Sequence, residues 1–226
     1  MKAPGTGRLH VYRKKILPQP ATIHAMYPTV AIFDSGGVLH ESIRTSEVIA
    51  RALGTDKSTM SEIWKAHLDK LSLGQIDEAT FWDLAHQDFG VRLPSPNEQL
   101  LEQGFVPPKA GPTPAVFAVV HRLRALGLRL ATIAPHARAL RYNGVYSGFD
   151  EVVLSFEVGL QKPDPVIYQL TLDRLGVTAD QAIFIDDLEQ NVEAASRLGM
   201  HGILFTGAPD LESILKIMLP DYARAR

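Results

Sequence analysis

The stretch Thr29-Val-Ala-Ile-Phe-Asp-Ser-Gly-Gly-Val-Leu39 constrains the fold of this chain more than any other part of it. Val30 to Phe33 form a short apolar run of mostly β-forming residues, which predicts a buried strand. Asp34 follows where that strand should end, and Gly36-Gly37 then predicts a sharp turn. Because ligands of open parallel α/β sheets bind outside the carboxyl ends of the strands, Asp34 lies where a binding site would form.

A carboxylate in that position has two interpretations. It can be a metal ligand or a nucleophile, and an aspartate that attacks phosphorus forms an aspartyl-phosphate. It can also cap the turn after a core strand and have no chemical role. This segment alone favours neither interpretation over the other.

Composition limits the class of protein. The 226 residues can bury a substantial core, in one domain or in one domain with an insertion. The net charge of -2 gives no reason to expect nucleic acid or an acidic membrane surface as a partner. No apolar run approaches the roughly 20 residues of a membrane span. The absence of cysteine excludes disulfides and thiolate metal sites, and we expect a cytoplasmic protein.

Residues 1–26 differ from the rest because they hold five basic residues, no acidic residue and several prolines. A basic start can indicate an organelle transit peptide, but this one has little serine and no clear amphipathic period. We favour a disordered tail, or a start ahead of Met26, and expect the fold to begin near Tyr27.

Residues 40–110 contain no convincing strand and predict successive helices. A first helix over about 45–53 ends at Gly54, and Thr59-x-x-Glu62 predicts a capping box that opens a second. A third covers about 77–88, and Ser95-Pro96 predicts the start of a fourth. Four aromatic residues are interpreted as the core of this bundle rather than as a substrate-stacking surface. They are Trp64, Phe81, Trp82 and Phe89.

After a stiff connector that ends at Pro114, strands alternate with helices. The predicted strands cover 128–133, 151–155, 182–185 and 202–205, and the predicted helices 113–126, up to about 143, 164–175 and 189–198. This alternation predicts a parallel sheet that helices cover on both faces. The predicted fold is therefore an α/β core over 27–39 and 111–226, with an inserted helical cap over 40–110.

Two later segments converge on Asp34 in this layout. Gly159-Leu-Gln-Lys-Pro-Asp164 presents Lys162 just before a helix. Phe184-Ile-Asp-Asp-Leu-Glu-Gln-Asn191 ends a strand in paired carboxylates, with Asn191 about one turn later. Carboxylates at adjacent strand ends repel one another unless a cation neutralises them, and all-oxygen ligands suit Mg²⁺. A lysine there would hold a phosphate or offset the charge of the nucleophile.

Each segment also has a plainer interpretation. Lys162 can be a surface lysine before a proline-led helix. Asp186-Asp187 can be a helix N-cap with an acidic first turn, which the helix dipole favours. The occurrence of all three segments in this order is harder to explain in that way.

The three segments resemble the motifs of the haloacid dehalogenase superfamily, over about residues 28–206. Ile32 to Leu39 is similar to its first motif, Gly159 to Pro165 to its third and Ile185 to Asn191 to its fourth. The resemblance implies a Rossmann-like doubly wound core with a helical cap inserted after the first motif.

It also implies roles for individual residues. Asp34 is the expected nucleophile, and Mg²⁺ is expected on Asp34, the Gly36 carbonyl and a fourth-motif acid. We expect Asp187 to be the direct ligand, with support from Asp186 and Asn191. Lys162 is expected to bridge the nucleophile and the phosphate, and the other expected phosphate contacts are Ser35, Gly37 and Thr132.

Gly36 departs from the family pattern. Phosphatases of the family usually carry a second aspartate there, which protonates the leaving oxygen and later activates water. General acid–base help of this kind is worth about 10²–10⁴-fold. Some phosphatase-like members also carry glycine, and His40 or Glu41 can substitute if the turn folds back, although an exposed hinge position is the plainer reading of both.

The second motif departs further. A Ser or Thr should end the strand after Gly127 and donate a hydrogen bond to the phosphoryl oxygen, but the usual spacing falls on Ala134-Pro135. Thr132 can take the role only if the strand ends early, and His136 is the other nearby donor. Losing one such donor costs on the order of 10²–10³-fold.

The function expected from these features is Mg²⁺-dependent hydrolysis of a small phosphorylated metabolite by a monomer or homodimer. One alternative is a metal-independent 2-haloacid dehalogenase, in which Asp34 attacks carbon. The other is a catalytically impaired relative that binds a phosphorylated ligand or a protein partner. Neither nucleic acid nor a membrane is an expected partner.

Overall fold

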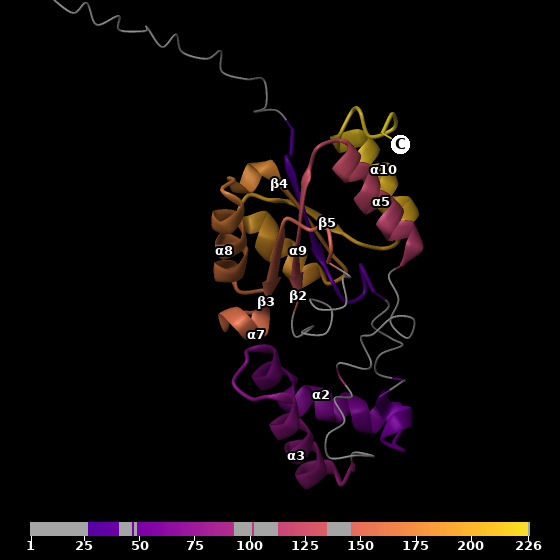
Figure 1. Ribbon diagram of the computed structural model, residues 1–226, viewed down its shortest axis with the longest axis vertical. Helices are drawn as coiled ribbons and strands as arrows, with labels where there is room; N and C mark the ends of the chain where they lie inside the picture. The colour runs from indigo at the N-terminus through magenta and orange to yellow at the C-terminus, as the bar shows by residue number, and fades with distance from the viewer. Residues whose placement is uncertain are drawn as a thin grey trace, which may run out of the picture.

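A computed structural model describes residues 27–40, 47, 49–92, 101, 113–134 and 146–225. It shows an α/β core above a smaller group of helices (Figure 1). Several sequence predictions fall outside the described residues. They are the basic tail over 1–26, the helix opened by Ser95-Pro96, most of the connector before Pro114, the helix ending near residue 143, and any role of Glu41 or His136.

The core contains a five-stranded parallel sheet with the strand order β3-β2-β1-β4-β5. The strands are β1 (Val30–Asp34), β2 (Arg129–Ala134), β3 (Glu151–Leu154), β4 (Ala182–Asp186) and β5 (His201–Leu204). The chain moves outward from β1 through β2 to β3, and then crosses to the other side of β1 for β4 and β5. The predicted α/β fold with a parallel sheet is confirmed.

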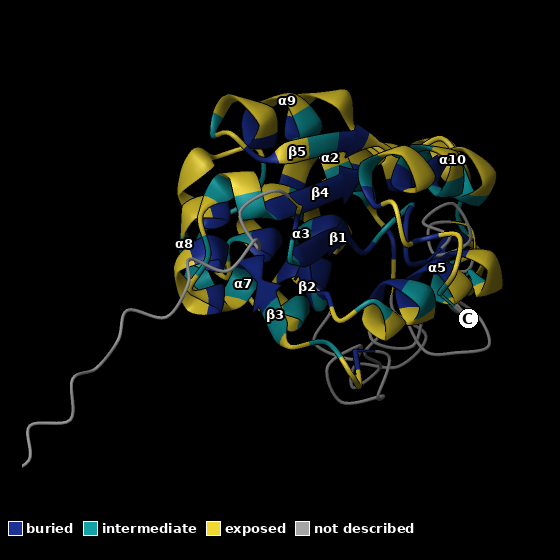
Figure 2. Ribbon diagram, turned by 90° about the horizontal axis from the view of Figure 1, so that it is seen from above, coloured by how far each residue is buried: buried dark blue, intermediate teal, exposed yellow. Residues whose placement is uncertain are grey.

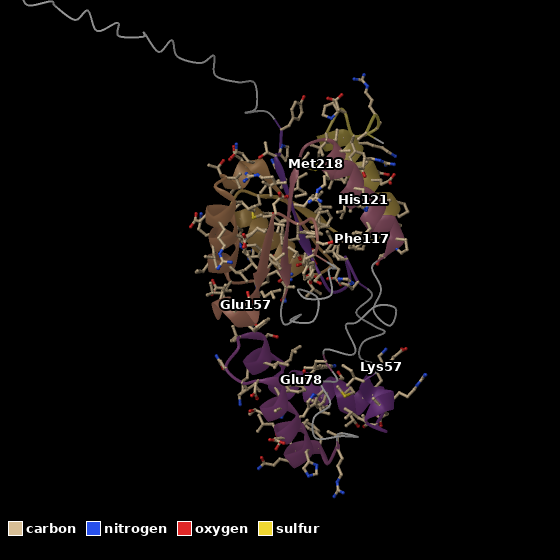
Figure 3. The ribbon with its side chains drawn as sticks, in the orientation of Figure 1. Lys57, Glu78, Phe117, His121, Glu157 and Met218 are labelled. Carbon is tan, nitrogen blue, oxygen red and sulfur yellow. The ribbon has the colours of Figure 1, made fainter. Side chains whose placement is uncertain are left out.

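Helices cover both faces of the sheet. One apolar cluster joins the sheet to α5 (Pro114–Ala125) and α10 (Ala208–Met218), and a second joins it to α8 (Pro165–Leu175) and α9 (Glu189–Arg197). Phe117 and Met218, which pack against the first cluster, lie together on the side of α5 and α10 (Figure 3).

Burial on both faces of the sheet explains why the sequence of the central strand β1 shows no alternation of polar and apolar residues. Ala31 and Phe33 belong to the first apolar cluster, whereas Val30 and Ile32 belong to the second. All five residues of β1 are buried, and Figure 2 shows the central strands dark blue. A parallel strand that is covered on both faces reads as a continuous apolar run.

The inserted helices have an apolar cluster of their own. It contains α2 (Lys57–Ser72), α3 (Glu78–Phe89) and the short helical stretch around Ile49. Phe81 and Trp82 are buried within it, and Trp64 and Phe89 pack against it, which confirms that the four aromatic residues form the core of this bundle. Lys57 on α2 and Glu78 on α3 mark this group of helices in Figure 3, below Glu157 on α7 (Ser155–Val158).

Two local predictions were wrong, and one helix was missed. The helix predicted to open at a Thr59–Glu62 capping box begins at Lys57, because the Asp56 carboxylate caps it by accepting from the Thr59 amide at 2.8 Å. The strand predicted to reach Ser155 ends at Leu154, where α7 begins. Helix α10 was not predicted, although Leu211 and Leu215, four residues apart, form its buried stripe.

Candidate active site

The candidate site lies where the strand order changes direction, between β1 and β4. Asp34 ends β1 and Asp186 ends β4, and the two strands pair in parallel. Both residues are buried, with relative exposures of 6% and 0%. In doubly wound sheets the crevice at such a point is the usual ligand site, because the loops from the two strands leave in opposite directions.

Lys162 joins these two carboxylates. Its Nζ donates to Asp34 Oδ1 and, at 2.7 Å, to Asp186 Oδ2, while the side chain is only 8% exposed. The ammonium also lies 5.7 Å from the centre of the Phe184 ring. The alternative of a surface lysine is therefore wrong: the structure brings Lys162 to the predicted Asp34 and Asp186.

Burial dominates the ionisation of Asp34. It raises the pKa of that carboxyl from 3.8 to about 6, because an ionised carboxylate loses its hydration there; Lys162 opposes this rise and Asp186 adds to it. Burial works against the charge of Lys162 as well, but Asp34 and Asp186 outweigh it, so the pKa of Lys162 is raised. The ammonium therefore stays charged at neutral pH.

The segment that carries Lys162 is fixed at both ends. Gly159 ends α7 in a left-handed conformation, with a φ of 67°. Asp164 caps α8 by accepting from the Val166 amide at 2.9 Å, and Pro165 occupies the first helical turn, as predicted. The Lys162–Pro163 peptide bond is cis.

Asn191 and a backbone amide hold Asp186. The Asn191 Nδ2 donates to both carboxylate oxygens, at 3.0 and 3.1 Å, and the Leu188 amide donates to Oδ1 at 2.9 Å. Tyr168 in turn donates to the Asn191 carbonyl at 3.1 Å. The capping alternative is thus partly right, since Asp186 accepts from the start of α9, but the N-cap position itself is Leu188.

Asp187 faces the turn after β1. Unlike Asp186 it is exposed, and desolvation followed by the charge of Asp186 raises its pKa. Gly37 has a φ of 86°, a conformation that favours glycine, and a Cβ there would displace the Asp187 carboxylate from its position against the turn. Oxygens of Asp34, Asp186 and Asp187 lie within 4.8 Å of one another, as a cluster that could hold a metal ion.

The turn from Ser35 to His40 closes tightly on itself. The His40 amide donates to the Ser35 carbonyl at 2.9 Å, and the Gly37 amide donates to the His40 carbonyl at 2.7 Å. His40 was expected at an exposed hinge, but it is 2% exposed and its ring lies edge-on to Tyr146 at 6.4 Å. That placement gives no support to His40 as a substitute acid.

The β2 side of the site differs from what was predicted. The condition for Thr132 as a phosphate contact is not met, because β2 continues to Ala134 and the buried Thr132 hydroxyl donates to the Phe33 carbonyl at 2.9 Å. Ala134 is fully buried at the strand end. Ser35 is buried too, and its hydroxyl forms a hydrogen bond with the Tyr146 hydroxyl, with the two oxygens 2.7 Å apart. Tyr146 was missed because its contact spans 111 positions and no local pattern announces it.

Comparison with known proteins agrees with this geometry. A family model described as haloacid dehalogenase-like hydrolase matches residues 31–205. The chain belongs to this family. The resemblance of its three motifs to the haloacid dehalogenase superfamily is thereby confirmed.

Solved structures share the fold. A predicted HAD-like hydrolase from Porphyromonas gingivalis has a TM-score of 0.66 and 23% identity, over 85% of this chain and 99% of its own. A HAD family enzyme from Bacteroides thetaiotaomicron, in complex with magnesium and inorganic phosphate, has a TM-score of 0.62 and 18% identity, over 78% and 93%. At these identities the similarity shows the fold alone.

Curated relatives include phosphatases. A sesquiterpene phosphatase of Aspergillus oryzae is 28% identical over 188 residues, which cover 78% of this chain and 89% of that protein. A glyceraldehyde 3-phosphate phosphatase of Methanopyrus kandleri is 32% identical over 95 residues, 39% of this chain and 41% of its own. Acyl-CoA dehydrogenase family member 10 of Mus musculus is 34% identical over 110 residues, so the chain covers 10% of that protein.

Among the described residues, no helix combines the length and the apolar character needed to cross a bilayer.

The raised pKa of Asp34 predicts how stability depends on pH without metal. The folded protein disfavours the ionised Asp34 carboxylate. The loss of folding stability that this causes is complete above the folded pKa of about 6 and disappears below the unfolded value of 3.8. We expect Asp34→Asn to be more stable than the wild type at neutral pH in EDTA, by on the order of 1–3 kcal/mol. The difference should shrink as the pH falls through this window.

Thermal unfolding of both proteins across that pH range measures this difference. Asp83→Asn, on the exposed face of α3, is the control and should shift stability by no more than about 0.5 kcal/mol at any pH. A lower melting temperature for Asp34→Asn than for the wild type at neutral pH would contradict the expected cost of the buried charge.

Proposed function

We propose that the chain is a Mg²⁺-dependent phosphomonoester hydrolase that acts through a phospho-aspartate at Asp34. The observation that carries the proposal is the buried Lys162 ammonium, which bridges Asp34 and Asp186 at the switch point of the sheet. A cation beside a carboxylate nucleophile suits an attack on an anionic phosphate, since it offsets the repulsion between the two. The phosphatases among the relatives support the same reaction class.

The residues present fit a magnesium ion. Oxygens of Asp34, Asp186 and Asp187 cluster within 4.8 Å, and hard oxygen ligands that leave room for water are what Mg²⁺ prefers. We assign Asp34, the Gly36 carbonyl and Asp187 as the ligands, and Asp186 as the support that Lys162 and Asn191 orient. The ion would neutralise charge on the transferring phosphoryl group.

The proposed reaction has two displacements. An Asp34 carboxylate oxygen attacks phosphorus as the bond between phosphorus and the ester oxygen breaks, and the leaving alkoxide takes a proton from water. A second water then attacks phosphorus of the phospho-aspartate, which releases inorganic phosphate and restores the carboxylate. Lys162 lies against the nucleophile, and Asp34 is mostly ionised above its pKa of about 6.

Because Gly36 has no side chain, the protein supplies no proton donor to the leaving group at that position. The predicted substitute His40 is buried beside Tyr146, and Glu41 lies outside the described residues. The rate should therefore depend strongly on how stable the leaving alkoxide is. This same position favours the second candidate, an impaired relative that binds a phosphorylated ligand without turning it over.

Helices α2 and α3 of the insert serve as the cap in this proposal. Their loop after α2 rests on α7: a Cβ at Gly74 would overlap the Phe156 carbonyl, so only glycine permits this approach. Gln161, the neighbour of Lys162, donates to Asp69 of α2 at 3.4 Å. The cap thus contacts the core next to the catalytic lysine, where it can close over a small phosphorylated metabolite and exclude water.

Phosphate release from a panel of small phosphomonoesters tests the proposal. We expect release that requires Mg²⁺ and that falls at least about 10³-fold in Asp34→Asn, because the substitution removes the nucleophile. Asp83→Asn should keep full activity. Release that persists in EDTA or in Asp34→Asn would contradict the assignment, and activity on 2-haloacids without metal would favour the dehalogenase.

The missing acid predicts a marked preference among substrates. The aryloxide of an aryl phosphate can depart without being protonated. We therefore expect aryl phosphates to be turned over at least about 10²-fold faster than alkyl phosphates. Gly36 is not among the described glycines with a positive φ, so its backbone conformation is one that an aspartate can adopt. Gly36→Asp should then raise kcat for alkyl phosphates about 10–10³-fold and change aryl turnover little.

Gly36→Ala is the matched control for the added side chain and should give no such gain. Equal kcat values for alkyl and aryl esters in the wild type would show that another group supplies the proton.

A further inference from the structure

The Lys162 ammonium has a third contact besides its two carboxylates. It lies over the face of the Phe184 ring, 5.7 Å from the ring centre, and Phe184 is fully buried in β4. A cation this close to an aromatic face is attracted by the negative potential of the ring, and the attraction is strongest where water is excluded. Because the Lys162 side chain is only 8% exposed, the contact belongs to that stronger class.

Phe184 lies on the face of the sheet that carries the two acids. It belongs to the apolar cluster that also holds Ile32 of β1, on the side of α8 and α9. Side chains two residues apart on a strand point to the same face. Asp34 follows Ile32 by two residues. Asp186 follows Phe184 in the same way, so the ring lies on the same face as both carboxylates.

A second aromatic residue fixes the Phe184 ring. Tyr168 of α8 packs edge-on against it, with ring centres 5.1 Å apart and planes at 88°. The Tyr168 hydroxyl donates to the Asn191 carbonyl at 3.1 Å, and the Asn191 side chain donates to Asp186. These contacts form a closed loop of five residues, in which Phe184 connects Lys162 to the groups that hold Asp186.

The ammonium has one donor hydrogen left for a ligand. An ammonium carries three hydrogens, and Asp34 and Asp186 accept one each. Among the described residues, no further acceptor for Lys162 is present. A cation that its protein contacts already hold in place does not have to be ordered when an anion binds. The remaining hydrogen is therefore presented to a ligand at a lower entropic cost.

One contact of Lys162 changes during the proposed reaction. Phosphorylation of Asp34 turns its carboxylate into a mixed anhydride and moves the negative charge to the phosphoryl oxygens. The contacts of Lys162 with Phe184 and Asp186 involve groups that keep their chemistry throughout the cycle. The ring is thus one of the two contacts that can hold the ammonium beside the phosphoryl group in the intermediate.

We propose that Phe184 is a positioning residue, whose ring face holds the Lys162 ammonium where it contacts a phosphoryl oxygen of the substrate. The ring acts through its electron density and not only through its bulk. Lys162 remains the group that touches the ligand. This inference rests on the proposed function, because it requires Lys162 to bind phosphate.

Fluorinated phenylalanines at position 184 separate electron density from bulk. Each fluorine withdraws density from the ring face, whereas the size of the side chain changes little. Calorimetric titration with inorganic phosphate in saturating Mg²⁺ should give an affinity that falls stepwise from phenylalanine through its 4-fluoro to its 3,4,5-trifluoro derivative. The full loss should be about 3–30-fold, the factor that corresponds to the usual strength of a cation–π contact. The kcat for phosphomonoesters should fall in the same order.

The same trifluoro derivative at position 149 is the matched control. Phe149 packs against the other apolar cluster, and its ring lies edge-on to Phe33 at 6.3 Å and to Tyr146 at 5.9 Å. Phosphate affinity and kcat should keep their wild-type values there. Equal losses at positions 184 and 149 would show a general effect of fluorine on the core and would overturn the proposal.

Phe184→Leu removes the aromatic face and keeps an apolar side chain. Phosphate affinity should fall at least as far as in the trifluoro protein, by about tenfold or more. Melting temperatures report whether each protein folds, and the fluorine series gives the answer if Phe184→Leu does not. A loss in Phe184→Leu without any trend along the fluorine series would show that the ring contributes packing alone, against the proposal.

The results distinguish this inference from the proposed function. No wild-type turnover together with a graded loss of phosphate affinity would refute the hydrolase and support the role of Phe184. Turnover that Asp34→Asn abolishes, together with the same kcat and phosphate affinity along the fluorine series, would support the hydrolase and overturn the role of Phe184. A wild type that binds no phosphate and shows no turnover would overturn both.

Discussion

The ion pairs of Lys162 with Asp34 and Asp186 are the interaction on which the rest of the site depends. Two carboxylates at the ends of neighbouring strands are 6% and 0% exposed, and burying two like charges side by side is costly without a cation between them. Lys162 supplies that charge from a third segment, and its own burial is tolerated only because both acids face it. Two acids and one lysine leave one buried negative charge uncompensated in the empty protein, which is costly. The arrangement is therefore best explained by a ligand that the charges are there to bind.

The topology explains why these groups come together from distant parts of the sequence. The parallel order places β1 between β2 and β4, so the carboxyl ends of all three strands reach one edge. The β4 side of that edge is charged, with Lys162 and Asp186. On the β2 side the strand ends at Ala134, which has no side-chain donor.

The sequence was informative wherever a property depends on neighbouring residues. The buried strand before Asp34, the proline-led start of α8 and the paired acids at the end of β4 all follow from short patterns, and the structure agrees. The capping box failed because Asp56 competes with Thr59 for the same helix end, and local chemistry allows both. Tyr146 and the burial of His40 depend on packing between distant segments, which one sequence does not encode in a readable pattern. The Thr132 hydroxyl was misplaced because strand length decides whether it faces the ligand or the sheet.

Acid quenching during turnover of a phosphomonoester tests the central claim most directly. Reduction of the quenched protein with borohydride converts a phospho-aspartate to homoserine, which peptide mass spectrometry locates. The account predicts this conversion at Asp34 alone, in the presence of Mg²⁺ and substrate, and none in Asp34→Asn. Phosphate release without any modification of Asp34, or modification of another carboxylate, would contradict the account.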